Sequence, residues 1–133
     1  MTKQEEIRYW IESAELDYRA MNNLYQSKDY VWALFLGHLV IEKLLKGLAA
    51  KNKITSVPKI HDLNKLAKVL GIEINESIKD LFDIITSFNI EARYPDYKKE
   101  FYNKCNTEFA SLYITKISEI RVWLLKQLKM QEN

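Results

Sequence analysis

Apolar side chains recur at steps of three and four residues along most of this chain, a spacing that places them on one face of an α-helix. The pattern is most regular between residues 29 and 51, where it forms a wide apolar stripe. The segments that we expect to be helical are residues 2–26, 29–51, 61–70, 75–93 and 103–129. Four long helices and one short one, joined by short connections, predict an all-α up-and-down four-helix bundle with one additional short helix.

Capping and turn-forming residues mark the expected helix ends. Gly71 is typical of the position that follows a helix, and Asn75 can cap the next helix. Pro95 should end that helix, because proline disfavours helical backbone at Tyr94. A polar, aromatic loop is expected from there to about Asn103.

The last predicted helix has an unusually wide apolar face. Trp123 and Leu125 lie beside its main apolar stripe rather than within it. Such a width is explained either by a partner chain that covers the face or by an intramolecular core that takes up these residues.

Composition fits one globular domain spanning residues 1–133, because a chain of this length buries roughly two-thirds of the surface that its unfolded form exposes. Three glycines and two prolines are too few for the turns of a many-stranded β protein. No uncharged run is long enough to cross a membrane, and the N-terminal residues show no secretion signal. The single cysteine, Cys105, excludes an internal disulfide. We therefore expect a cytoplasmic protein that does not enter a membrane.

The formal net charge of +2 conceals an uneven distribution. Residues 42–68 carry seven lysines and two acidic residues, whereas acidic residues are in excess in 1–27 and 69–100. A phosphate-bearing partner would therefore be attracted to one local site. This pattern argues against a protein that coats nucleic acid along its whole surface.

The first polar group on an otherwise apolar helix consists of His38, Glu42 and Lys46, which are four residues apart and share one face. One interpretation is an ion pair of Glu42 with Lys46 on a solvated face. The other is a polar strip at a seam with another helix or with a second copy of the chain. Gly37 beside it would allow another helix to approach closely.

His61 and Asp62 form the second polar group, at the start of the short helix. Either side chain can cap that helix. His61 is also a candidate for an anion or proton-transfer contact, since imidazole both donates and accepts hydrogen bonds near neutral pH. We expect no metal and no cofactor, because 23 residues separate His38 from His61 and neither has a second ligand at zinc spacing.

The third polar group is the sequence Arg93-Tyr94-Pro95-Asp96-Tyr97. A guanidinium group binds phosphate with two parallel hydrogen bonds, and tyrosine rings stack on bases. The alternative is a structural ion pair of Arg93 with Asp96 or Glu91. The predicted nucleotide- or phosphate-binding residues are Arg93, Tyr94, Asp96, Tyr97, Lys43, Lys46 and His61.

Nearly the whole chain, residues 3–128, resembles the HEPN domain family. The elements that carry the resemblance are Trp10 with Asp17, the segment from Gly37 to Lys46, the triplet His61-Asp62-Leu63 and the run from Ala92 to Asp96. The resemblance implies a helical bundle that forms a homodimer. It also implies a minimal nucleotidyltransferase as partner, in a toxin–antitoxin or resistance-type module.

Many members of that family are metal-independent ribonucleases, in which an arginine is followed four to six residues later by a histidine at a dimer cleft. None of the arginines of this chain has a histidine at that distance. The sequence therefore favours a nucleotide- or RNA-binding protein without catalysis. Two alternatives remain: a ribonuclease in which Arg93 meets His38 or His61 in space, and a non-catalytic protein-interaction module.

Overall fold

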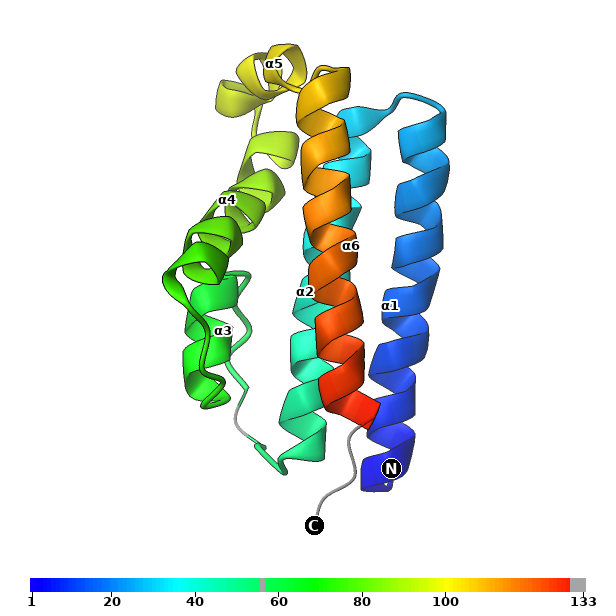
Figure 1. Cartoon of the computed structure of the whole chain (residues 1–133), viewed down its shortest axis with the longest axis vertical. Coiled ribbons are helices and arrows are strands. Elements are labelled where there is room, and N and C mark those ends of the chain that lie inside the picture. The colour runs from blue at the N-terminus through cyan, green and yellow to red at the C-terminus, as the bar shows by residue number, and fades with distance from the viewer. Residues whose placement is uncertain (56, 130–133) are drawn as a thin grey trace.

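The computed structural model describes residues 1–55 and 57–129 and contains six α-helices in that part of the chain. They are α1 (Lys3–Gln26), α2 (Tyr30–Lys51), α3 (Leu63–Val69), α4 (Glu76–Arg93), α5 (Pro95–Lys104) and α6 (Thr107–Lys129). No strand occurs among these residues, so the all-α prediction is confirmed. Figure 1 shows α1, α2, α4 and α6 alternating in direction along the long axis, as an up-and-down bundle requires.

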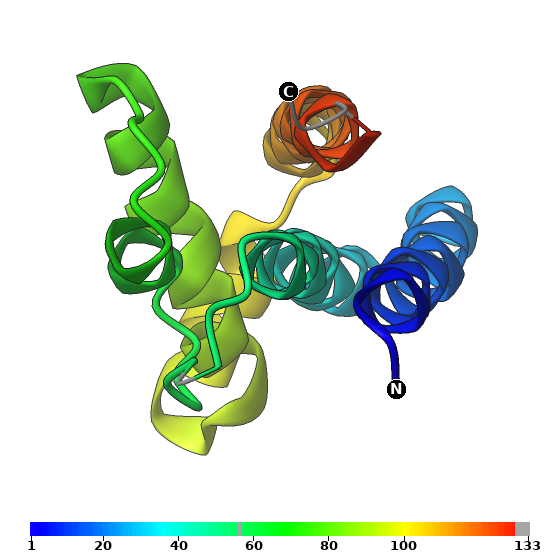
Figure 2. The ribbon, with the colours of Figure 1, turned by 90° about the horizontal axis from the view of Figure 1, so that it is seen from below.

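Helix α2 lies at the centre of the bundle. Seen from one end, it stands between α1 and α4, and α6 lies against a third side (Figure 2). Its sequence accounts for this position, because apolar residues occur on more than one face and most of them are buried. The neighbouring helices therefore place their apolar faces against α2.

Glycine residues set the distance between α2 and α6. A Cβ atom added at Gly37 would lie 2.5 Å from Cδ1 of Ile117, closer than side chains pack. A Cβ atom at Gly47 would lie 3.2 Å from Cδ2 of Leu128 and 3.3 Å from Cβ of Trp10. The close helix approach expected at Gly37 is confirmed. Gly47 has the same role nearer to the C-terminal end of α2.

The prediction of a loop after Pro95 is wrong, because residues 95–104 form helix α5. Proline does end α4, since Tyr94 has extended backbone with φ −88° and ψ 128°. The proline ring also fixes φ near the helical value and lacks an N–H that a first turn leaves unpaired, so Pro95 begins the next helix. Phe101 anchors α5 by packing its buried ring against Phe88, with centroids 5.5 Å apart.

Four helices begin at a side chain that accepts a hydrogen bond from a backbone N–H three residues later. The acceptors are Thr2 of α1, Asp62 of α3, Asn75 of α4 and Asn106 of α6, at 3.1, 3.1, 2.8 and 2.8 Å. Asp62 therefore caps α3, which leaves the imidazole of His61 for other contacts. Gly71 follows α3 with a φ of 68°, as expected.

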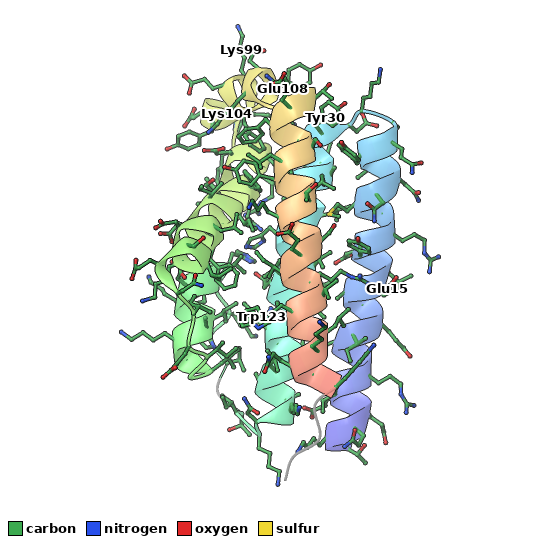
Figure 3. The ribbon with its side chains drawn as sticks, in the orientation of Figure 1. Glu15, Tyr30, Lys99, Lys104, Glu108 and Trp123 are labelled. Atoms are coloured by element: carbon green, nitrogen blue, oxygen red, sulfur yellow. The ribbon has the colours of Figure 1, made fainter. Side chains whose placement is uncertain are left out.

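Helix α6 uses most of its wide apolar face within the bundle. Trp123 and Leu125 are half-buried and pack against the core, and Figure 3 shows Trp123 on the side of α6 that faces α3 and α4. These two residues complete the intramolecular core. Among residues 1–55 and 57–129, no helix combines the length and the apolar character that a membrane span needs.

Candidate functional site

The polar strip on α2 lies at a helix seam and not on a solvated face. His38 is fully buried and Glu42 is 4% exposed. Their partners come from α4 and from the connection between α2 and α3. Of the two interpretations of the strip, the structure therefore supports the seam.

His38 connects these two partners. Its Nε2 lies 2.7 Å from the carbonyl oxygen of His61, and its Nδ1 lies 3.3 Å from Nδ2 of Asn89. A neutral imidazole with its hydrogen on Nε2 satisfies both contacts, because Nε2–H then donates to the carbonyl and Nδ1 accepts from the amide. Burial lowers the pKa of His38, an effect that the hydrogen bond with His61 and the charge of Glu42 oppose in part. His38 is accordingly a neutral structural link at pH 7.

Asn89 also contacts Arg93, and so connects it to His38. Nε–H of Arg93 donates to the carbonyl oxygen of Asn89 at 2.9 Å, and a terminal N–H of the same guanidinium donates to the Asn89 side-chain oxygen. The guanidinium carbon also lies 5.9 Å from the ring centroid of Phe35 and 5.5 Å from that of Tyr94. Arg93 is exposed, yet these contacts fix its orientation.

Glu42 and His61 form the second half of the site. Oε1 of Glu42 lies 2.7 Å from Nδ1 of His61, and Oε2 lies 3.4 Å from Nζ of Lys46. A buried carboxylate needs such partners, because removing it from water costs several kcal/mol. The His61 side chain is 55% exposed. The carboxylate thus accepts a hydrogen bond from Nδ1–H of the imidazole, and Nε2 is left for other contacts. A carboxylate that orients the imidazole in this way prepares a histidine for proton transfer.

The remaining predicted residues take different places. Nζ of Lys43 lies 2.7 Å from Oδ2 of Asp17 on α1, so its charge is engaged on the other side of α2. Tyr94 and Tyr97 are about half exposed, at 51% and 52%, near the junction of α4 and α5. Asp96 lies in the first turn of α5. The guanidinium of Arg93 donates to Asn89 and does not form the ion pair with Asp96 that was the alternative interpretation.

The structure thus joins Arg93, His38 and His61 in one connected set, which the sequence spacing did not show. Sequence reasoning gave no role to Asn89, the residue that makes the connection. The available signal was its position, because an amide at residue 89 continues the buried register of Phe82 and Ile85 on the inner face of α4. A polar residue in such a register requires a buried partner.

No group of three or more His, Cys, Asp or Glu side chains is arranged to hold a metal ion within the part of the chain that the structure describes. The polar groups that meet at the site are imidazole, guanidinium, carboxylate and amide groups.

The fold and this seam define the class of protein: a helical-bundle domain with a polar side-chain network built around its central helix. The sequence model of the family described as HEPN domain matches residues 7–128. The chain belongs to the HEPN domain family, and is a helical module of a nucleotide- or RNA-related kind. Neither the curated proteins nor the solved structures provided a match.

Proposed function

We propose that this HEPN domain binds the phosphate groups of a nucleotide or an RNA at the surface formed by Arg93 and His61. One observation carries the proposal: two exposed side chains are each oriented by hydrogen bonds to a buried polar residue. Asn89 orients Arg93, Glu42 orients His61, and His38 connects the two pairs. Burying polar groups is costly compared with apolar packing, so a network of this kind is better explained by the groups it presents than by stability.

The hydrogen bonds to Asn89 determine which edge of Arg93 is available. They occupy Nε–H and one terminal nitrogen, and a guanidinium group has five N–H donors. The end of the group remains for two parallel hydrogen bonds to phosphate oxygens. The half-exposed ring of Tyr94 beside it offers a surface on which a base can stack.

The test is a titration of the protein into a labelled single-stranded oligoribonucleotide, followed by fluorescence anisotropy at two salt concentrations. Arg93→Gln should weaken binding about tenfold or more, because a hydrogen bond to a charged group contributes about 1.5–3 kcal/mol. Arg19→Gln is the matched control, since Arg19 is an exposed arginine on α1. Equal affinities of the Arg93→Gln and Arg19→Gln variants would remove Arg93 from the site.

A second candidate function, metal-independent ribonuclease activity, is favoured by the pair of Glu42 and His61. Nε2 of His61 would take the proton from a ribose 2′-hydroxyl, whose oxygen then attacks the adjacent phosphorus. The 5′-oxygen leaves with a proton returned by the imidazolium, and a 2′,3′-cyclic phosphate forms. Arg93 would stabilise the charge that develops on the phosphate. Cleavage in the presence of a chelator that His61→Ala abolishes would support this function, and an uncleaved RNA with wild-type protein would refute it.

We also propose that the domain works in the cytoplasm as a homodimer, together with a minimal nucleotidyltransferase in a toxin–antitoxin or resistance-type module. Family membership supports this assignment. Light scattering after size exclusion should give twice the chain mass of 15.8 kDa. Co-expression with a nucleotidyltransferase encoded in the neighbouring gene should yield a complex, and a strictly monomeric protein without such a complex would contradict the assignment.

A further inference from the structure

A cleft lies at the end of the bundle opposite α5, apart from the surface of Arg93. It opens between the first half of α1, the end of α2 and the connection that leads to α3, and its volume is about 440 Å³. That volume is within the range of pockets that take small molecules, roughly 300–1,000 Å³. Figure 1 shows this end of the molecule at the bottom, where α1 begins and α2 ends.

The lining of the cleft combines an aromatic and apolar wall with positive charge. Trp10 provides the aromatic side, next to small apolar residues of α2 and the connection. The charged side chains are Lys46, Lys53, Lys59 and Glu6. Because Lys46 is paired with Glu42, Lys53 and Lys59 supply the positive charge of the cleft beside the one carboxylate of Glu6, and the cleft favours a ligand that has both a flat apolar group and negative charge.

Lys46 belongs both to this cleft and to the candidate site. Its Nζ lies 5.5 Å from the ring centroid of Trp10 and 3.4 Å from Oε2 of Glu42. The other oxygen of Glu42 holds His61. The eight residue steps from His38 to Lys46 advance about 12 Å along α2 at 1.5 Å per residue. The cleft and the surface of Arg93 and His61 are therefore consecutive parts of one strip.

We propose that the cleft is a subsite for one nucleotide unit, with its base against Trp10 and its phosphate between Lys53 and Lys59. Stacking on an aromatic side chain and contact with lysine are the two interactions by which proteins hold a nucleotide without reading its sequence. The inference rests on the proposed function, because it makes the cleft the base-binding part of the same RNA site. It adds the substrate class: a strand that is unpaired at this nucleotide, since a base within a duplex cannot reach Trp10.

Adenosine 5′-monophosphate is the probe for the cleft, and calorimetric titration measures its affinity. Lys53→Glu should weaken its binding about tenfold, because the substitution reverses a charge beside the phosphate. Lys28→Glu is a matched control, since Lys28 and Lys53 are both exposed, both follow a long helix and both have a positive φ, 67° and 58°. Trp10→Leu keeps an apolar residue but removes the ring, and should also weaken binding.

The same titrations separate this inference from the proposed function. Arg93→Gln should weaken binding of a single-stranded tetraribonucleotide by a larger factor than it weakens binding of the mononucleotide. If Lys53→Glu binds the mononucleotide as tightly as Lys28→Glu does, or if wild-type protein does not bind it, the subsite is refuted. If Lys53→Glu weakens the mononucleotide but Arg93→Gln leaves the tetranucleotide unchanged, the subsite stands and the assignment of Arg93 fails.

Discussion

The free energy of unfolding of this bundle should fall as the pH decreases from 7.5 to 5.5. His38 should contribute to that fall, because the unfolded chain takes up a proton at this residue that the folded chain does not. Burial lowers the pKa of His38 in the folded chain, whereas the unfolded chain has the ordinary value of 6.5. Below pH 6.5 the unfolded state therefore binds a proton that the folded state does not accept. The contribution of His38 is fully present above pH 6.5 and is lost as the pH falls towards the lowered value.

The magnitude follows from the buried position. His38 has no exposed surface, and protonation at Nδ1 would place an N–H against the donating amide of Asn89. If the folded state stays neutral down to pH 5.5, linkage gives a loss of about 1.4 kcal/mol over this interval. This is an upper limit for one histidine, and it is a substantial part of the stability of a small domain.

Urea unfolding followed by circular dichroism at pH 7.5, 6.5 and 5.5 measures this loss. His38→Gln removes the titration but keeps a donor for the His61 carbonyl and an acceptor for Asn89. The free energy of unfolding of this variant should depend less on pH than that of the wild type, by about 1 kcal/mol over the interval. A pH dependence of His38→Gln equal to that of the wild type would refute the reasoning, and so would an imidazole signal of His38 that titrates at its ordinary pKa.

Three further predictions concern packing, the network and the thiol. In Gly37→Ala the new Cβ meets Cδ1 of the buried Ile117, at a cost of about 1–3 kcal/mol that should exceed the gain of up to about 1 kcal/mol from the helix propensity of alanine; the free energy of unfolding in urea should therefore fall, and a rise would contradict the close packing. Asn89→Ala should cost about 1–3 kcal/mol, since His38 loses a buried partner, and should weaken RNA binding in the anisotropy assay; unchanged binding would show that Arg93 needs no support. Burial raises the pKa of Cys105 to about 12, so a disulfide reagent at pH 8 should modify it slowly until urea unfolds the chain, whereas fast labelling of the native protein would contradict its burial.

The helices that could be predicted are those whose apolar residues repeat over several turns. Helices α1, α2, α4 and α6 have 18 or more residues each, so their apolar faces are visible in the sequence. Helix α5 has ten residues and begins with Pro95, a residue that the sequence presents as the end of α4. Its stability comes from the burial of Phe101 against Phe88, a tertiary contact that local periodicity does not contain.

Three members of the candidate site were singled out from the sequence, but Asn89 and the connection between them were not. Arg93, His38 and His61 were identified from their chemistry, yet their connection runs through Asn89 on α4 and through the backbone carbonyl of His61. Such contacts depend on how the helices pack around α2.

Helix register also decides which basic residues reach this site. Lys43 and Lys46 are three residues apart, but Lys43 pairs with α1 and Lys46 reaches Glu42. The sequence alone treats them as one group of positive charge.

The most direct test of the proposed phosphate site is to observe the side chains that form it. In two-dimensional proton–nitrogen spectra, the Nε–H signal of Arg93 and the side-chain amide of Asn89 are the reporters. Addition of a single-stranded tetraribonucleotide should shift both signals in a salt-dependent way and leave the Nε–H signal of Arg19 in place. Binding that shifts the Arg19 signal while the Arg93 and Asn89 signals do not move would contradict the phosphate site proposed here.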